Sequence, residues 1–149
     1  MLEFDAKALY YKSKAYIRRS LDLRNQAMTS EHVLLASIAL ELLGKSTLAS
    51  IHPVLIADPT DDGKSIMAAC GHPFTDRVKT IQMKTVLARL SLVLNLDSST
   101  KSAAEDIAEI RNAELHSGRA ATAGLAIDEW TPKFWRVAKK FLEGQEKGF

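Results

Sequence analysis

One stretch of the sequence, residues 110–118 (Ile-Arg-Asn-Ala-Glu-Leu-His-Ser-Gly), combines side chains suited to proton transfer and to phosphate binding. The imidazole of His116 titrates near neutral pH and can take or give a proton. Arg111 keeps its charge and can hold a phosphate through two hydrogen bonds. Asn112 can orient the phosphate or either neighbour. These groups suffice for metal-independent RNA cleavage, in which the 2′-hydroxyl attacks the adjacent phosphate and leaves 2′,3′-cyclic phosphate and 5′-hydroxyl ends.

The helical position of Arg111 predicts a partly buried guanidinium. Arg111 is in phase with the apolar Ala104, Ile107 and Leu115, so it points toward the apolar face of its helix or the border of that face. An arginine cannot lose its charge in such a place and needs a partner. Glu41, in the polar seam of an otherwise apolar predicted helix, is one candidate.

His116 and Arg111 are not expected to share a helical face. They are five residues apart, which is about 140° around a helix, whereas Asn112 and His116 at i and i+4 lie together. One compact site with both Arg111 and His116 therefore needs a distorted helix end or two chains that meet across a two-fold axis. The second option predicts a homodimer with a composite site.

A purely structural interpretation of Arg111 and His116 stays open. Cationic side chains are common in last helical turns, where they satisfy carbonyl groups and complement the helix dipole. The same dipole favours a protonated His116, so this residue suits the role of a general acid at least as well as that of a general base.

The rest of the sequence predicts an all-α fold, a four- or five-helix bundle with one long irregular connection at about 52–76. Prolines and turn residues cluster in this connection, which has room for a short helix at 65–70. The main helices are expected at 5–23, at 29–50 with Thr29 or Ser30 as N-cap, at 76–96, at 102–117 and at 131–144.

Capping signals set three of these boundaries. Ser102 and Glu105 form a capping box at the start of the fourth helix, and Gly118 stands where a C′ glycine belongs. The fifth helix is expected to begin with Thr131 as N-cap and Pro132 at its first position.

The spacing of apolar residues predicts the buried face of three helices. These faces are Phe4, Ala8, Tyr11 and Ala15 in the first helix, Val78, Ile81, Thr85, Ala88 and Leu92 in the third, and Trp130, Phe134, Val137 and Phe141 in the fifth.

Composition predicts one globular domain over residues 1–149, since 46% of the residues are hydrophobic and 26% are charged. The single cysteine, Cys70, excludes a disulfide framework within the chain. Cys70 and His72 offer two metal ligands without a second cluster. Gly44-Lys45-Ser46 resembles the end of a P-loop, but Ala39 replaces the earlier glycine and the segment is helical. We therefore expect neither a metal nor a cofactor.

Charge is distributed unevenly along the chain. The net charge is +2, with six Lys and Arg against three acids in residues 1–30, two against six in 31–76, and twelve against nine in 77–149. A phosphate-binding face should therefore be built from the two ends. The candidate RNA-binding residues are Lys7, Lys14 and Arg18, which form one stripe of the first helix, and Arg119.

The sequence shows no targeting segment. Its longest apolar stretch, 33–43, is interrupted and too short to span a bilayer. We therefore expect a cytoplasmic protein without membrane contacts.

An all-α bundle with Arg111, Asn112 and His116 near the end of a late helix resembles the HEPN superfamily (higher eukaryotes and prokaryotes nucleotide-binding domains). The hallmark of that family is Arg, four to six residues, then His, often with a polar residue after the Arg. The apolar helix with residues 39–45 is also similar to the buried helix of the family. The resemblance covers most of residues 29–143, closely at the motif and loosely elsewhere.

The resemblance implies a metal-independent endoribonuclease that acts on RNA as a homodimer. Arg111 and His116 carry over as catalytic residues and Asn112 as a supporting one. Many relatives are toxins or belong to anti-phage defence, so an antitoxin or a C-terminal regulatory domain is an expected partner. Other relatives are only dimerisation or partner-binding modules of larger proteins, and this chain resembles an N-terminal domain of such a protein.

Overall fold

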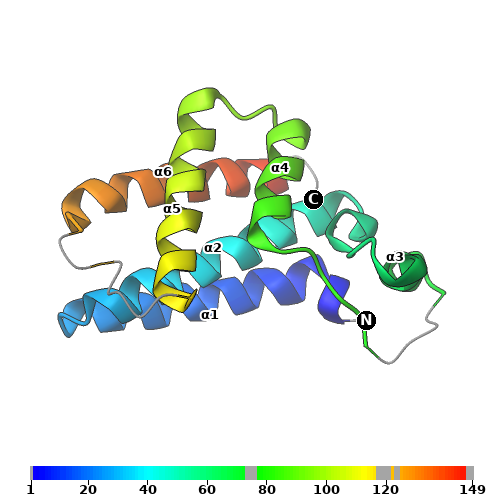
Figure 1. Ribbon diagram of the computed structural model, residues 1–149, viewed down its shortest axis with the longest axis horizontal. Coiled ribbons are helices and arrows are strands. Elements are labelled where there is room, and N and C mark those ends of the chain that lie inside the picture. The colour runs from blue at the N-terminus through cyan, green and yellow to red at the C-terminus, as the bar shows by residue number, and fades with distance from the viewer. Residues whose placement is uncertain (1, 73–76, 117–121, 123–124, 147–149) are drawn as a thin grey trace.

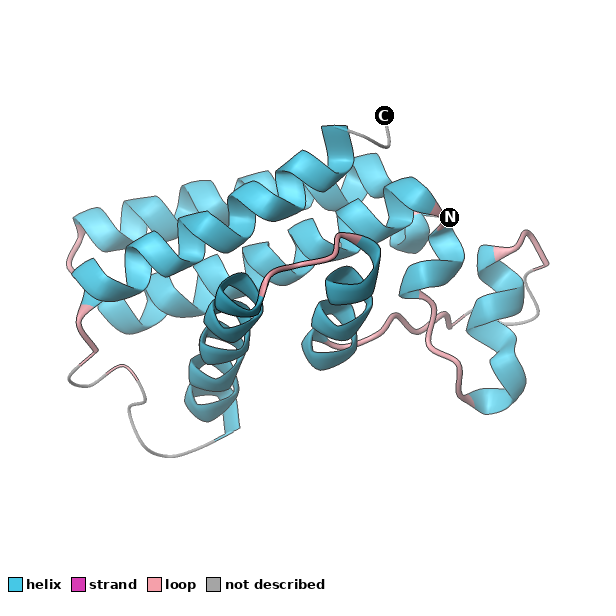
Figure 2. Ribbon diagram, turned by 90° about the horizontal axis from the view of Figure 1, so that it is seen from above, coloured by secondary structure: helices cyan, strands magenta, loops and turns pink. Residues whose placement is uncertain are grey.

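The computed structural model describes residues 2–72, 77–116, 122 and 125–146, and every regular element within these ranges is helical. Three long helices lie side by side in one layer, and two further helices pack across one face of it (Figures 1 and 2). The prediction of an all-α bundle is confirmed. The layer consists of α1 (Ala6–Asn25), α2 (Thr29–Ile51) and α6 (Ile127–Glu146), and the crossing helices are α4 (Met83–Val93) and α5 (Ser98–His116).

The connection after α2 is more ordered than the expected irregular segment. It contains the 3₁₀ helices Pro53–Ile56 and Asp61–Gly63 and the short helix α3 (Lys64–Ala69), which confirms the helix expected at 65–70. Residues 73–76 lie outside the described ranges. An isolated antiparallel bridge joins Ala57 to Thr80 and closes the base of this segment.

The central helix of the bundle is α2, which packs against α1, α4, α5 and α6. Its length and mean hydropathy of 1.5 would allow a helix to cross a membrane, but 56% of that window is buried inside the bundle. Hydroxyl groups also tie α2 to its neighbours, since Ser46 Oγ donates to the Ala6 carbonyl at 2.7 Å and Thr47 Oγ1 donates to the Phe141 carbonyl at 2.9 Å. The central position therefore accounts for the apolar composition of α2.

The buried face of α1 differs from the predicted one. Tyr11 is 65% exposed, whereas two serines, Ser13 and Ser20, are buried. Ser13 Oγ donates to the Ala39 carbonyl at 2.7 Å, so the hydroxyl is satisfied inside the interface with α2. Small side chains at these positions also let the two helices approach closely.

Two other helices begin at different residues than predicted. Residues 77–82 precede α4 rather than form its first turns, and Leu92, expected on the apolar face, is 84% exposed. The N-cap of α2 is Met28 rather than Thr29 or Ser30.

The helix α6 begins four residues before the expected N-cap Thr131, and Pro132 lies inside it. The predicted stripe of Trp130, Phe134, Val137 and Phe141 is buried, as expected. Gly144 continues the helix instead of ending it. A Cβ atom there would lie 2.7 Å from Leu94 Cδ2, so the glycine allows the Leu94 side chain to pack closely against α6.

The helix α5 begins at Ser98, which corrects the predicted capping box. The Asp97 carboxylate accepts a hydrogen bond from the Thr100 backbone N–H at 2.7 Å, and Ser102 is an exposed residue within the helix. This bond holds the pKa of Asp97 below its ordinary value. The predicted C′ glycine, Gly118, lies outside the described residues.

We expect Asp97→Ala to lower the melting temperature, because it leaves N–H groups of the first turn of α5 without an acceptor. The matched variant Ser102→Ala should leave the melting temperature unchanged, since Ser102 caps nothing in this structure. Thermal unfolding followed by circular dichroism checks both. A larger fall in melting temperature for Ser102→Ala than for Asp97→Ala would instead support the capping box at residue 102.

The imidazole of His32 is buried where α1, α2 and α6 meet. Its Nδ1 donates to the Ser20 carbonyl at 2.8 Å, and its ring meets Trp130 edge to face. Burial lowers the pKa of His32 below 6.5, the Ser20 bond opposes this shift, and the nearby Arg24 adds to it. His52, by contrast, does cap a helix, because its Nδ1 accepts from the Val54 N–H at 3.0 Å.

Acidification should destabilise the fold through His32. Its pKa is lower in the folded chain than in the unfolded one, so the unfolded state binds more protons below about pH 6.5. The free energy of unfolding should therefore fall as the pH drops from about 7 to about 5. Urea titrations should show a smaller fall in His32→Asn, whose amide can donate to the same carbonyl, and an unchanged fall in His52→Asn.

Candidate active site

A polar pocket of about 270 Å³ lies between α2, the C-terminal half of α5 and the segment that precedes α4. The bridge between Ala57 and Thr80 holds this segment beside α2. The Ile81 N–H donates to the Ile56 carbonyl at 3.0 Å, and this bond also holds the segment before α4 in place. The pocket is lined by Glu41, Lys45, Thr80, Ile81, Gln82, Arg111, Asn112, Leu115 and His116.

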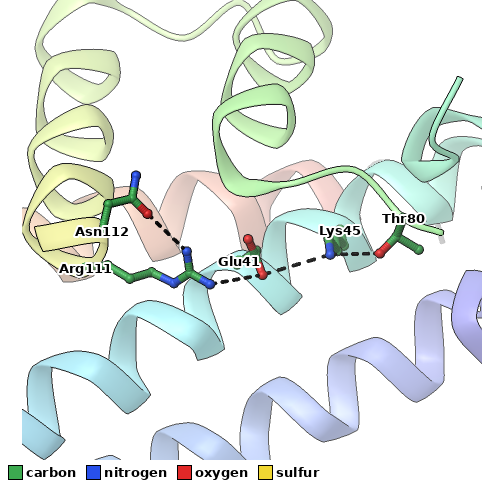
Figure 3. Close-up of polar contacts among 5 residues, drawn as sticks. All are labelled: Glu41, Lys45, Thr80, Arg111 and Asn112. Atoms are coloured by element: carbon green, nitrogen blue, oxygen red, sulfur yellow. Dashed lines mark hydrogen bonds and ion pairs between the residues drawn. The ribbon is translucent and has the colours of Figure 1, made fainter. Parts of the chain in front are cut away.

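A chain of polar contacts runs across the pocket from α5 to the segment before α4 (Figure 3). Arg111 Nη2 lies 3.7 Å from Glu41 Oε2, and the same carboxylate oxygen lies 3.9 Å from Lys45 Nζ. Lys45 Nζ also donates to Thr80 Oγ1 at 2.9 Å. Glu41 is therefore the partner of Arg111, as the sequence suggested, and it is shared by two cations.

The pKa of Lys45 reflects both its burial and the charges around it. Burial is the main reason that its pKa lies below the ordinary lysine value, and the carboxylate of Glu41 only partly opposes this shift. The charges of Arg111 and Lys12 lower the pKa of Lys45 further. Lys12, on the exposed surface of α1, therefore adds to the potential of the pocket.

Arg111 and Asn112 form the α5 side of the pocket. The Arg111 side chain is 17% exposed, and its Nη1 makes a long hydrogen bond of 3.4 Å to Asn112 Oδ1. Its Nε is buried and has no hydrogen-bond partner among the described residues. Buried donors are rarely left without an acceptor, so Arg111 retains capacity for a further acceptor.

His116 is exposed in the last turn of α5 and borders the same pocket as Arg111. The helix keeps its regular assignment up to His116, so neither a distorted end nor a second chain is needed for both residues to reach one pocket. Both residues line this pocket although they are about 140° apart around α5, and Glu41 and Lys45 of α2 line it as well.

The predicted RNA-binding stripe lies away from this pocket. Lys7, Lys14 and Arg18 are exposed on α1 and none of them lines the pocket, whereas Arg119 lies outside the described residues. Sequence reasoning had also passed over Lys45, Thr80 and Gln82 as site residues. The available signal for Lys45 was its place with Glu41 in the polar seam of α2.

The described part of the chain contains no group of three or more His, Cys, Asp or Glu side chains placed to hold a metal ion. Cys70 is exposed there as a free thiol.

No protein-family model, no curated protein and no solved structure matches this chain. The function is therefore inferred from the pocket and from the resemblance of its Arg–His motif.

Removal of the shared charge should destabilise the protein. Glu41→Gln leaves two largely buried cations without their carboxylate, and we expect a loss of about 1–3 kcal/mol in the free energy of unfolding, between the values for exposed and for buried pairs. Glu143→Gln is the matched control, because it breaks only the exposed pair with Lys140. Urea unfolding of both variants checks this ranking, and equal stabilities would contradict the assigned role of Glu41.

Proposed function

We propose that this protein is a metal-independent endoribonuclease of the HEPN type. The observation that supports this most directly is the meeting of Arg111, Asn112 and His116 at one open polar pocket. Lys45 adds a second cation to the pocket, while Glu41 is the single carboxylate among the described residues that line it. Such an excess of positive charge suits the phosphodiester of an RNA backbone.

In the proposed reaction a ribose 2′-hydroxyl attacks the adjacent phosphorus while the bond to the departing 5′-oxygen breaks. His116 takes the proton from the 2′-hydroxyl or supplies one to the 5′-oxygen, and water exchanges the proton at the other oxygen. Arg111 stabilises the charge that builds on the phosphate oxygens, with Lys45 as a second, more distant cation. Asn112 holds the guanidinium through its side-chain oxygen and keeps its amide N–H groups for the substrate.

The proposal includes a homodimer in which the two pockets lie near the shared interface. Leu115, at the rim of the pocket, is 45% exposed and offers an apolar contact there. A second copy would also cover the open side of the pocket, which would strengthen the electrostatic interactions inside it by excluding water.

The test is cleavage of a mixed RNA pool in EDTA, with analysis of the product ends. We expect cyclic phosphate and 5′-hydroxyl ends from the unmodified protein, and a loss of about 100-fold or more in His116→Ala, the range typical for a general acid or base. Arg111→Lys should lose a similar factor while it keeps the charge beside Glu41.

Two controls separate catalysis from folding. His52→Ala removes an exposed histidine elsewhere, and Arg136→Ala removes an exposed arginine that donates to Ser99 Oγ. Both should cleave RNA at the unmodified rate. Full activity in His116→Ala, or no cleavage by a folded unmodified protein, would contradict the proposal and favour a non-catalytic module.

A further inference from the structure

An apolar groove of about 130 Å³ runs between α1 and α6, with α2 as its floor. The floor consists of small and aliphatic side chains, Ala39, Leu40 and Leu43. The walls are formed by Tyr10, Ser13, Lys14 and Ile17 of α1 and by Phe134, Trp135, Ala138 and Leu142 of α6.

The groove continues toward the C-terminal end of α1. A much smaller hollow there, of about 10 Å³, shares Ile17, Phe134 and Trp135 with it and adds Leu21, Arg24 and Thr131. From Thr131 to Leu142 the two hollows follow α6 for roughly 16 Å, at 1.5 Å per residue. This length matches three turns of a helix.

Large apolar side chains on or beside this groove are exposed to solvent. Trp135 is 46% exposed, Leu142 38% and Leu21 37%. Clustered exposed apolar groups are unusual on a monomer and mark interaction surfaces. A concave apolar channel between two helices fits the apolar face of a third helix.

The wall formed by α1 is strongly basic. This helix carries six cations and one acid, Asp22, although one of the cations, Lys12, lies near the polar pocket instead. None of the six makes an ion pair with a described residue. Lys14 lines the groove itself, and Lys7 and Arg18 are exposed on the same stripe of α1.

We propose that this groove binds an acidic amphipathic helix of a partner protein. The apolar face of such a helix would fill the channel between α1 and α6, and its carboxylates would meet the cations of α1. A second copy of this chain fits less well, because it would bring a second basic helix toward the first. An RNA strand would match the cations but not the apolar lining.

The proposed interaction surface is separate from the RNA site. Ala39 and Leu43 face the groove, whereas Glu41 and Lys45, two residues further along α2, face the polar pocket. Two residues correspond to about 200° of helical rotation, so the two surfaces lie on nearly opposite sides of α2. A partner in the groove would leave the pocket open.

The probe is a synthetic helical peptide of about four turns, with leucines at i, i+3, i+4 and i+7 and glutamates on the remaining surface. Calorimetric titration into the full chain should show saturable binding that weakens with salt. The same peptide with lysine in place of every glutamate should bind at least about tenfold more weakly.

Variants of the protein locate the binding surface. Trp135→Ala should abolish binding through loss of the apolar wall, and the double charge reversal Lys14→Glu with Arg18→Glu should weaken it about tenfold without touching the core. Leu92→Ala removes an apolar side chain on α4 that is even more exposed, at 84%, and should bind like the unmodified protein.

Three results would overturn the proposal. The first is absence of binding, and the second is equal binding of the lysine peptide. The third is a different occupant of the groove, which would be a second copy of the chain, a phosphatidylserine vesicle or an RNA oligomer. Such an occupant is shown if the peptide does not bind and Trp135→Ala abolishes the self-association, the vesicle binding or the RNA binding. None of these measurements depends on RNA cleavage, so the groove and the ribonuclease site can fail separately.

Discussion

The carboxylate of Glu41 lies between Arg111 and Lys45, in the middle of the most buried helix of the bundle. Two cations on different helices would repel each other at this place if no anion stood between them. Glu41 thus lets α5 pack across α2 with its arginine directed inward. The polar pocket is a consequence of this packing, since two of its walls are the helices that the carboxylate joins and the third is the segment before α4.

The other polar groups of α2 serve attachment rather than chemistry. Ser46 and Thr47 donate to carbonyls of α1 and α6, and Gln145 Nε2 donates in turn to both hydroxyls. Buried hydroxyl groups satisfied in this way fix the neighbouring helices in rotation as well as in distance. These bonds hold α1 and α6 against the helix that carries Glu41 and Lys45.

Sequence patterns predicted those elements whose burial follows hydrophobic spacing. The aromatic stripe from Trp130 to Phe141 was such a case, because large apolar side chains leave one orientation for the helix. The face of α1 was mispredicted for the opposite reason. Ser13 and Ser20 count as polar in any pattern, and only their partners on α2 explain why they are inside.

The candidate site was predictable in part. Arg111, Asn112 and His116 share one segment, so their types and spacing were enough to select them, and Glu41 followed from the need of a buried guanidinium for an anion. Thr80 and Gln82 could not be inferred, because a bridge between residues distant in sequence brings them to the pocket. Long-range pairing of this kind leaves no local signal.

Because of that bridge, the length of the segment between Ala57 and Thr80 does not determine the geometry of the pocket. Between Ala57 and Thr80 the described part of the chain forms the 3₁₀ helix Asp61–Gly63 and the helix α3, and the pairing of Ala57 with Thr80 closes this excursion at its base. Because the entropy of closing a loop changes only slowly with its length, residues could be gained or lost between these two positions at modest cost. Insertions in this excursion would therefore leave Thr80 and the rest of that pocket wall in the same position.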